Sequence, residues 1–156
     1  RIEGRKPPRY RTELSDWAHQ HWRPILDVSA ETDGVMAAAF TDMNGFLPTH
    51  LTRYSQTPTG DLSHDTRFCR NGRIIFDAID KKAKTSTDDY MMAVYRQEGD
   101  GKTYNVVRNV YVPIVIEGRR WGNLELAYTF DGQGFAHTGR EAISTTAPQG
   151  MAAVTA

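Results

Sequence analysis

Three strand-like runs joined by short glycine turns constrain the fold of this chain more than any other feature. They cover Tyr90–Arg96, Tyr104–Ile116 and Trp121–Phe130, and each is rich in β-branched and aromatic residues. Glu98-Gly-Asp-Gly101 forms the first connection, and Glu117-Gly-Arg119 forms the second. Connections this short join antiparallel neighbours. The sequence therefore predicts an antiparallel meander in this half of the domain.

The preceding half supplies a helical segment and two shorter strands. An apolar helical pattern runs from Ser15 to Val28, and Pro24 within it either kinks the helix or divides it in two. Val35–Thr41 is predicted to be a strand, followed by an Asn-Gly turn and a second short strand from Phe46.

A second helix is expected to run through Cys69 to about Lys82. With this helix, the order of elements predicts an α+β domain with a single antiparallel five-stranded sheet and helices on one face.

Charge and length exclude several functional classes. The 156 residues suit one domain, and 19 basic residues balance 19 acidic ones, so no net charge attracts nucleic acid or anionic lipid. No apolar stretch approaches the ~18 residues of a membrane span. One cysteine cannot form an internal disulfide, which is compatible with a reducing compartment.

The two ends differ in composition from the middle. Ile2-Glu-Gly-Arg5 matches a protease recognition sequence used in protein expression, so residues 1–5 are expected to be a remnant of it. Residues 6–130 form the expected domain. Residues 131–156 are rich in Gly, Thr and Ala without apolar periodicity, and are expected to be a flexible tail.

Cys69 is the only candidate thiol nucleophile. On a helical wheel it lies at the edge of an apolar face with Phe68 and Phe76, while Arg70 and Arg73 lie opposite. No histidine is within one helical turn, so core packing is favoured over a reactive or redox role. The two arginines either face solvent and intramolecular partners or contact an anionic ligand or a partner subunit.

Neither a metal site nor a catalytic motif is evident among the remaining residues. The five histidines match no zinc-binding spacing, and no phosphate loop or nucleophile elbow is present. A b-type haem in an apolar pocket would have His50 as its candidate axial ligand. The protein is therefore not expected to be an enzyme, with a Cys69 hydrolase kept as the alternative.

Five stretches, taken in order, resemble one family. They are PPRYRT (Pro7–Thr12), FTDMNGFLPTH (Phe40–His50), YSQTPTGD (Tyr54–Asp61), FCRNGRIIFD (Phe68–Asp77) and VPIVIEGRRWGNLELAY (Val112–Tyr128). Together these stretches are similar to the PAS/Cache-like sensor module of bacterial methyl-accepting chemotaxis proteins, in the Cys-Arg-Asn form placed at the carboxyl end of the receptor.

The chain departs from the family pattern at several positions. Phe46 replaces a tyrosine, Leu51 replaces an asparagine and Arg120 replaces a histidine, and residues 81–89 lack the usual Gly and Asn pattern. A polar network or ligand specificity that depends on the missing Asn and His would differ here.

The resemblance implies a sensory domain that binds a small ligand or senses redox state and signals through its helices and a homodimer. Its partner would be the signalling module of a chemoreceptor, and its location the cytoplasm, with a periplasmic receptor domain as the alternative. Trp17 and Trp22 mark the expected dimer or transmission helix. A haem-binding gas or redox sensor and a ligand-free dimerisation module remain alternatives. The expected ligand-binding residues are His50, Tyr54, Arg70, Arg73 and Trp121.

Overall fold

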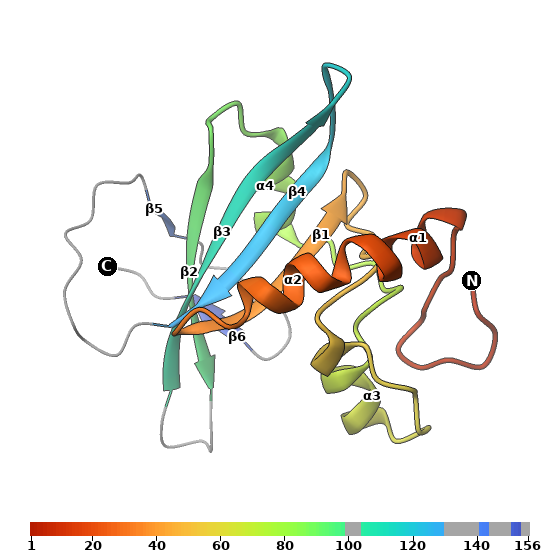
Figure 1. Cartoon of the computed structure of the whole chain (residues 1–156). Coiled ribbons are helices and arrows are strands. Elements are labelled where there is room, and N and C mark those ends of the chain that lie inside the picture. Colours follow the sequence, from red (N-terminus) through yellow and green to blue (C-terminus); the bar gives the residue numbers. More distant parts are fainter. Residues whose placement is uncertain (99–103, 130–140, 144–150, 154–156) are drawn as a thin grey trace.

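Four antiparallel strands form the centre of the domain (Figure 1). The computed structural model describes the helices, strands and loops of residues 1–98, 104–129, 141–143 and 151–153. The strands lie in the order β1-β4-β3-β2, and the meander predicted from the glycine turns is confirmed. The chain is therefore an α+β protein, as predicted. The bounds are β1 (Val35–Asp42), β2 (Met91–Glu98), β3 (Tyr104–Ile116) and β4 (Arg119–Tyr128).

The predicted five-stranded antiparallel sheet is not observed. Phe46 makes only an isolated bridge with Ile74, so the expected second strand does not form. Two three-residue strands instead pair with β2, namely β5 (Glu141–Ile143), which is parallel, and β6 (Met151–Ala153), which is antiparallel. Both belong to residues 131–156, the segment expected to be a tail, whose other residues lie outside the described part.

The amino-terminal helical pattern divides into two helices, α1 (Glu13–His21) and α2 (Arg23–Ser29). The break lies just before Pro24, because proline is tolerated in the first turn of a helix and not in its interior. The first helix begins at Glu13 rather than at Ser15, whose hydroxyl oxygen accepts a hydrogen bond from the Thr12 N–H at 3.0 Å.

Helices cover both faces of the sheet, and the prediction of helices on one face is wrong. Trp22 packs against Phe40 of β1 with ring centroids 4.8 Å apart, whereas Lys84 of α4 (Ala78–Thr85) donates to the hydroxyl of Thr41 at 2.7 Å. Successive side chains on a strand point to opposite faces. The α1–α2 pair and α4 therefore lie on opposite sides of the sheet, as Figure 1 shows.

The continuous helix expected through Cys69 is also wrong. Helix α3 (Leu62–Phe68) ends just before Cys69, and α4 begins only after Asp77. Between them Gly72 has a φ of +75°, and a Cβ there would lie 2.5 Å from the Tyr10 carbonyl oxygen. The segment gives its backbone hydrogen bonds to distant loops, among them Gly72 N–H to Leu47 O at 2.7 Å. These tertiary contacts outweigh the local helical pattern.

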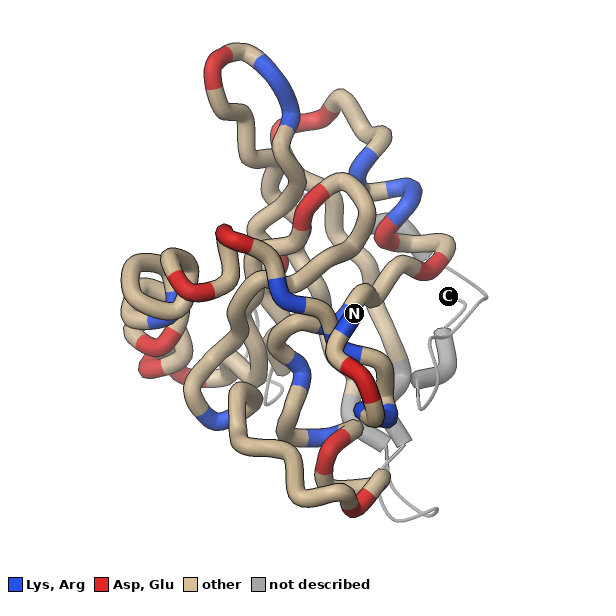
Figure 2. The backbone as a smooth tube through the Cα atoms, turned by 90° about the vertical axis from the view of Figure 1, so that its right-hand side faces the viewer, with Lys and Arg blue, Asp and Glu red and all other residues tan. Residues whose placement is uncertain are grey.

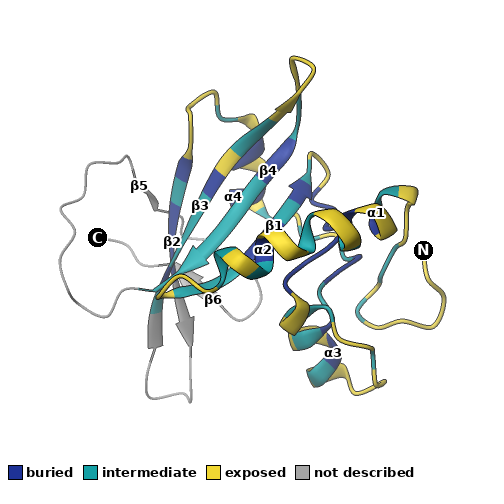
Figure 3. Ribbon diagram, in the orientation of Figure 1, coloured by how far each residue is buried: buried dark blue, intermediate teal, exposed yellow. Residues whose placement is uncertain are grey.

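The described core residues form two clusters, one on each face of the sheet. Figure 3 shows buried positions along the strands of the sheet. One cluster centres on Leu26 of α2, with Ala38 and Leu51. The other joins α4 to the opposite face and contains Ile79, Ala83, Met91, Ala93, Tyr95 and Tyr111. Cys69 is 1% exposed, which agrees with the predicted packing role. It is buried although the continuous helix expected to contain it does not form.

Acidic and basic positions are interspersed along the described chain (Figure 2). Within the described ranges, no helix has both the length and the apolar character needed to cross a bilayer.

Substitution of Gly122 tests how closely β1 and β4 approach each other. A Cβ at this position would collide with the Thr41 carbonyl oxygen of the neighbouring strand. Gly122→Ala is expected to lower the free energy of unfolding by about 2–3 kcal/mol, measured by urea denaturation. Gly118→Ala is the control, because nothing lies within 4 Å of its Cβ position and only its φ of +73° opposes alanine, at about 1 kcal/mol. Equal losses in the two variants would contradict the predicted clash.

Candidate functional site

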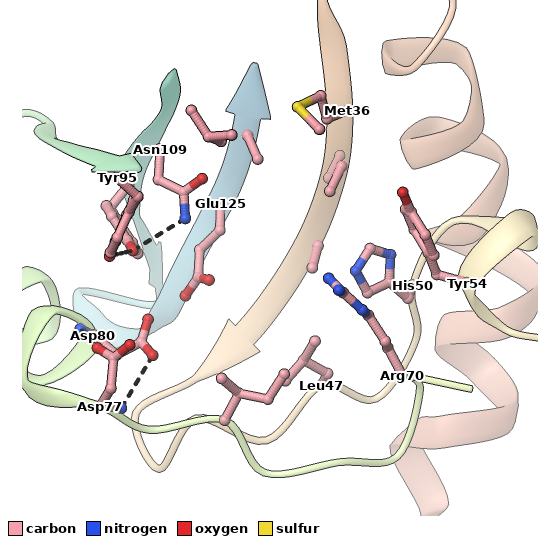
Figure 4. A pocket seen from close by; sticks show the side chains of 17 residues that line it. Met36, Leu47, His50, Tyr54, Arg70, Asp77, Asp80, Tyr95, Asn109 and Glu125 are labelled. Atoms are coloured by element: carbon pink, nitrogen blue, oxygen red, sulfur yellow. Dashed lines mark hydrogen bonds between the residues drawn. The ribbon is translucent and has the colours of Figure 1, made fainter. Parts of the chain in front are cut away.

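A pocket of about 170 Å³ lies on the sheet face that α4 covers (Figure 4). The strands form its floor, and the loop before Tyr54, the segment after Cys69 and the start of α4 form its walls. Its polar lining consists of His50, Tyr54, Arg70, Asp77, Asp80, Tyr95, Asn109, Tyr111 and Glu125.

Three of the five residues expected to bind a ligand meet in this pocket, namely His50, Tyr54 and Arg70. The other two lie elsewhere. Arg73 donates from Nη1 to the carbonyl oxygen of Thr66 at 3.1 Å. Trp121 packs edge-on against Trp22, with ring centroids 5.1 Å apart, on the opposite face of the sheet. Arg73 and Trp121 are therefore not part of this site.

His50 is a neutral hydrogen-bond donor in the pocket wall. Its Nδ1 accepts the backbone N–H of Leu51 at 2.8 Å, and its side chain is almost fully buried. Burial, and to a lesser extent the nearby positive charges of Arg70 and Arg53, lower the pKa of His50 to about 3. Because Nδ1 accepts, the ring proton is on Nε2, which has no protein partner within the described ranges.

This geometry does not fit a haem ligated by His50. Iron ligation through Nε2 requires the lone pair of that atom and a donor proton on Nδ1. Here Nδ1 accepts a hydrogen bond from the Leu51 N–H, so the ring proton is on Nε2. The pocket is also smaller than the ~300 Å³ at which clefts for drug-sized ligands begin.

Arg70 contributes a positive charge to the same wall. Its guanidinium lies 5.0 Å from the centre of the Tyr54 ring, and its backbone N–H donates to the Tyr54 carbonyl oxygen at 2.8 Å. Burial lowers the pKa of Arg70, but an arginine remains charged at any physiological pH. No carboxylate of the described residues lies within 4 Å of its side-chain nitrogens. The pocket therefore contains a cation that lacks an anionic partner in the described structure.

The opposite wall is acidic. Glu125 of β4 pairs with Lys84 of α4, with Oε1 and Nζ 3.2 Å apart, and accepts the hydroxyl proton of Thr41. Burial raises the pKa of Glu125, and the Lys84 ammonium opposes this rise. Among the described residues, no other basic nitrogen lies within 4 Å of a carboxylate on this side.

Asp80 is a buried carboxyl at the start of α4, four residues before Lys84. Its side chain is 4% exposed, and one oxygen accepts the Asp77 N–H at 3.3 Å. No basic nitrogen from the described ranges approaches it within 4 Å. Burial, the Glu125 charge and the Asp77 charge raise the pKa of Asp80 to about 7. Near neutral pH this group can either hold a proton or face a cation.

Asn109 adds an acceptor to the pocket. Its amide nitrogen donates to the Tyr111 hydroxyl at 3.3 Å, and that hydroxyl lies 2.9 Å from the Tyr95 hydroxyl. The Asn109 Oδ1 is buried and has no hydrogen-bond partner. Asn109 and Glu125 are not among the ligand-binding residues predicted from the sequence. The available signal was the alternation of polar residues on strands that are otherwise apolar.

A second cluster joins His64, Asp65 and Cys69, whose possible ligand atoms lie within 4.8 Å of one another. The Asp65 carboxylate already accepts the backbone N–H groups of Thr59 and Gly60, at 2.8 Å and 3.1 Å, and these bonds lower its pKa. Burial and the Asp65 charge raise the pKa of the Cys69 thiol, so it stays protonated. This cluster closes a loop, and its protonated thiol is not the thiolate that nucleophilic attack requires.

No protein-family model matches the chain, and no curated protein shows significant sequence similarity to it.

Replacing Asp80 by asparagine tests the buried carboxyl. The folded pKa of about 7 lies above the ordinary value of 3.8, so the stability this group contributes is complete below pH ~4 and lost as pH rises through 7. Asp80→Asn is expected to match the wild type at pH 4 and to be more stable by about 2–4 kcal/mol at pH 8. Chemical denaturation at both pH values measures this, with the exposed Asp89→Asn as control. If the free energies of unfolding of Asp80→Asn and the wild type differed by the same amount at both pH values, the raised pKa of Asp80 would be contradicted.

The rate at which Cys69 is alkylated tests whether its thiol is reactive. We expect iodoacetamide to label the native protein at least ~100-fold more slowly than the protein in urea, because labelling needs an opening that costs about 3 kcal/mol or more. Mass spectrometry of the time course measures both rates. Similar rates would mean that the thiol is accessible and would revive a redox or nucleophilic role for it.

Proposed function

We propose that this chain is a non-enzymatic sensory domain of PAS/Cache-like type from a bacterial chemotaxis transducer, and that its pocket binds a small molecule. The observation that carries the proposal is the guanidinium of Arg70, which lies in the pocket wall without an anionic partner from the described residues. A ligand carboxylate is the group that best satisfies it, because arginine and carboxylate form charge-assisted hydrogen bonds. The neutral His50 beside it offers one more donor.

A ligand is favoured over redox sensing as the input. The only thiol of the chain, Cys69, is buried and its pKa is raised, which disfavours oxidation at that sulfur. A haem-based input is disfavoured by the hydrogen bond at Nδ1 of His50.

The loop that carries His50 connects the pocket to the amino-terminal helices. Thr49 is fully buried, and its hydroxyl oxygen lies 2.9 Å from Nδ1 of His19 in α1 and accepts from Nε of Arg23 in α2 at 3.4 Å. Two residues further on, Leu51 packs against Leu26 of α2. A ligand that moves His50 would therefore change the contacts of both helices, which gives occupancy of the pocket a route to the helices.

The exposed apolar residues on the outer side of these helices support the proposal of a homodimer. Trp17, Ile25 and Val28 are 48%, 59% and 64% exposed, although each is a large apolar residue. Trp22, by contrast, packs against Phe40 and belongs to the sheet side. We place the dimer surface on the exposed side of α1 and α2. The signalling module of the receptor would respond to a change in this dimer, in a cytoplasmic protein or, as the alternative, in a periplasmic receptor domain.

Arg70→Met tests the proposed binding. The methionine keeps an apolar stem against Tyr54 and removes the charge. A metabolite library screened by thermal shift is expected to yield a carboxylate ligand, and Arg70→Met should bind it about 10- to 100-fold more weakly by calorimetry.

Arg73→Met is the matched control, because Arg73 contacts Thr66 outside the pocket. It should bind like the wild type. If no member of the library shifts the melting temperature, or if Arg70→Met binds normally, the proposal fails and the ligand-free dimerisation module becomes the better reading.

A further inference from the structure

We propose that the ligand is a small zwitterion, with a carboxylate held by Arg70 and His50 and a protonated amine held by Asp80 and its neighbours. The inference rests on the proposed function and specifies the chemical class of the ligand. It follows from how charge is distributed across the pocket, with donors in one wall and acceptors in the other (Figure 4).

The acceptor wall has more carboxylates than cations. Asp77 accepts the N–H groups of Ile79 and Asp80 at 2.8 Å and 2.9 Å, which occupies it as the cap of α4. Glu125 is occupied by Lys84 and Thr41. Asp80 accepts one backbone N–H and has no basic nitrogen within 4 Å in the described ranges, and the Lys84 ammonium, which is bound to Glu125, acts on it only from a distance.

A donor is also missing on the strand side of this wall. The Asn109 Oδ1 is buried without a hydrogen-bond partner, although such atoms are nearly always satisfied in folded proteins. An ammonium group supplies three donors and one positive charge. It would satisfy the Asp80 carboxylate and offer a donor to Asn109, and a neutral ligand group would leave Asp80 without a counter-charge.

The wall formed by Arg70 and His50 requires a negatively charged ligand group. Arg70 supplies a guanidinium that has no carboxylate of the described residues within 4 Å, and His50 supplies the N–H of Nε2. A simple amine would leave Arg70 without a partner, and a simple carboxylate would leave Asp80 without one. Only a molecule that carries both charges satisfies the two walls together.

The size of the cavity limits the ligand further. About 170 Å³ is less than the ~300 Å³ of the smallest clefts for drug-sized ligands. The space suits an amino acid or a short amino-carboxylate and is too small for a nucleotide or a lipid.

The test separates the two charges of the ligand. The probes are the standard L-amino acids, β-alanine and γ-aminobutyrate. Each one that binds is then compared with two molecules of the same carbon skeleton, one without the amine and one without the carboxylate. Calorimetry on the full chain is expected to show at least tenfold weaker binding for both truncated molecules.

The variants assign each charge to its wall. Asp80→Asn should weaken the zwitterion at least tenfold and leave the amine-free acid unchanged, whereas Arg70→Met should weaken both. Asp89→Asn, an exposed substitution outside the pocket, should change neither. Circular dichroism confirms that each variant is folded.

Three results would overturn the inference. An amine-free acid that binds as tightly as the zwitterion, with Asp80→Asn unaffected, would remove the amine site and leave the proposed sensory function intact. Zwitterion binding that Arg70→Met leaves unchanged would place the ligand outside this pocket. Absence of binding by every zwitterion and every carboxylate tested would remove both the inference and the proposed function.

Discussion

The buried ion pair between Lys84 and Glu125 holds the pocket together. Lys84 is the only basic side chain of α4 that reaches the sheet, and it contacts β4 through Glu125 and β1 through Thr41. Removing one partner of such a pair typically costs 3–5 kcal/mol, because the other charge remains buried. The pair fixes α4 over the sheet and thereby sets the position of Asp77 and Asp80 at the start of that helix. The shape and the acidity of one pocket wall both depend on it.

The two faces of the sheet have different roles. One face carries α4 and the pocket, and the other carries α2 and the aromatic stack of Trp22 with Phe40 and Trp121. The loop from Thr49 to Thr52 contacts both sides, since Thr52 donates to Asp27 of α2 while His50 faces the pocket. A structural change at the pocket can thus reach the helices through one short loop, without a rearrangement of the sheet.

The parts of the fold that sequence predicts well are those decided by neighbours in the chain. The meander follows from glycine turns between β-rich runs, and the break between α1 and α2 follows from Pro24. The helix through Cys69 fails because its residues bond to distant loops, with Gly72 in a conformation that helices do not use. The side of the sheet that each helix covers is likewise decided by packing, and no single strand reveals it.

The difference between local sequence and tertiary packing also explains which residues of the candidate site could be predicted. His50, Tyr54 and Arg70 follow from short motifs and meet in the pocket, whereas Arg73 and Trp121 belong to the same motifs and point elsewhere. The acidic wall was missed because Asp80 and Glu125 are 45 positions apart, and equal totals of acid and base do not show where carboxylates are buried. Polar residues at alternate positions of an apolar strand are the only local sign of such a wall. That sign marks which residues face a cavity, and only the fold shows that a guanidinium faces them from the other side.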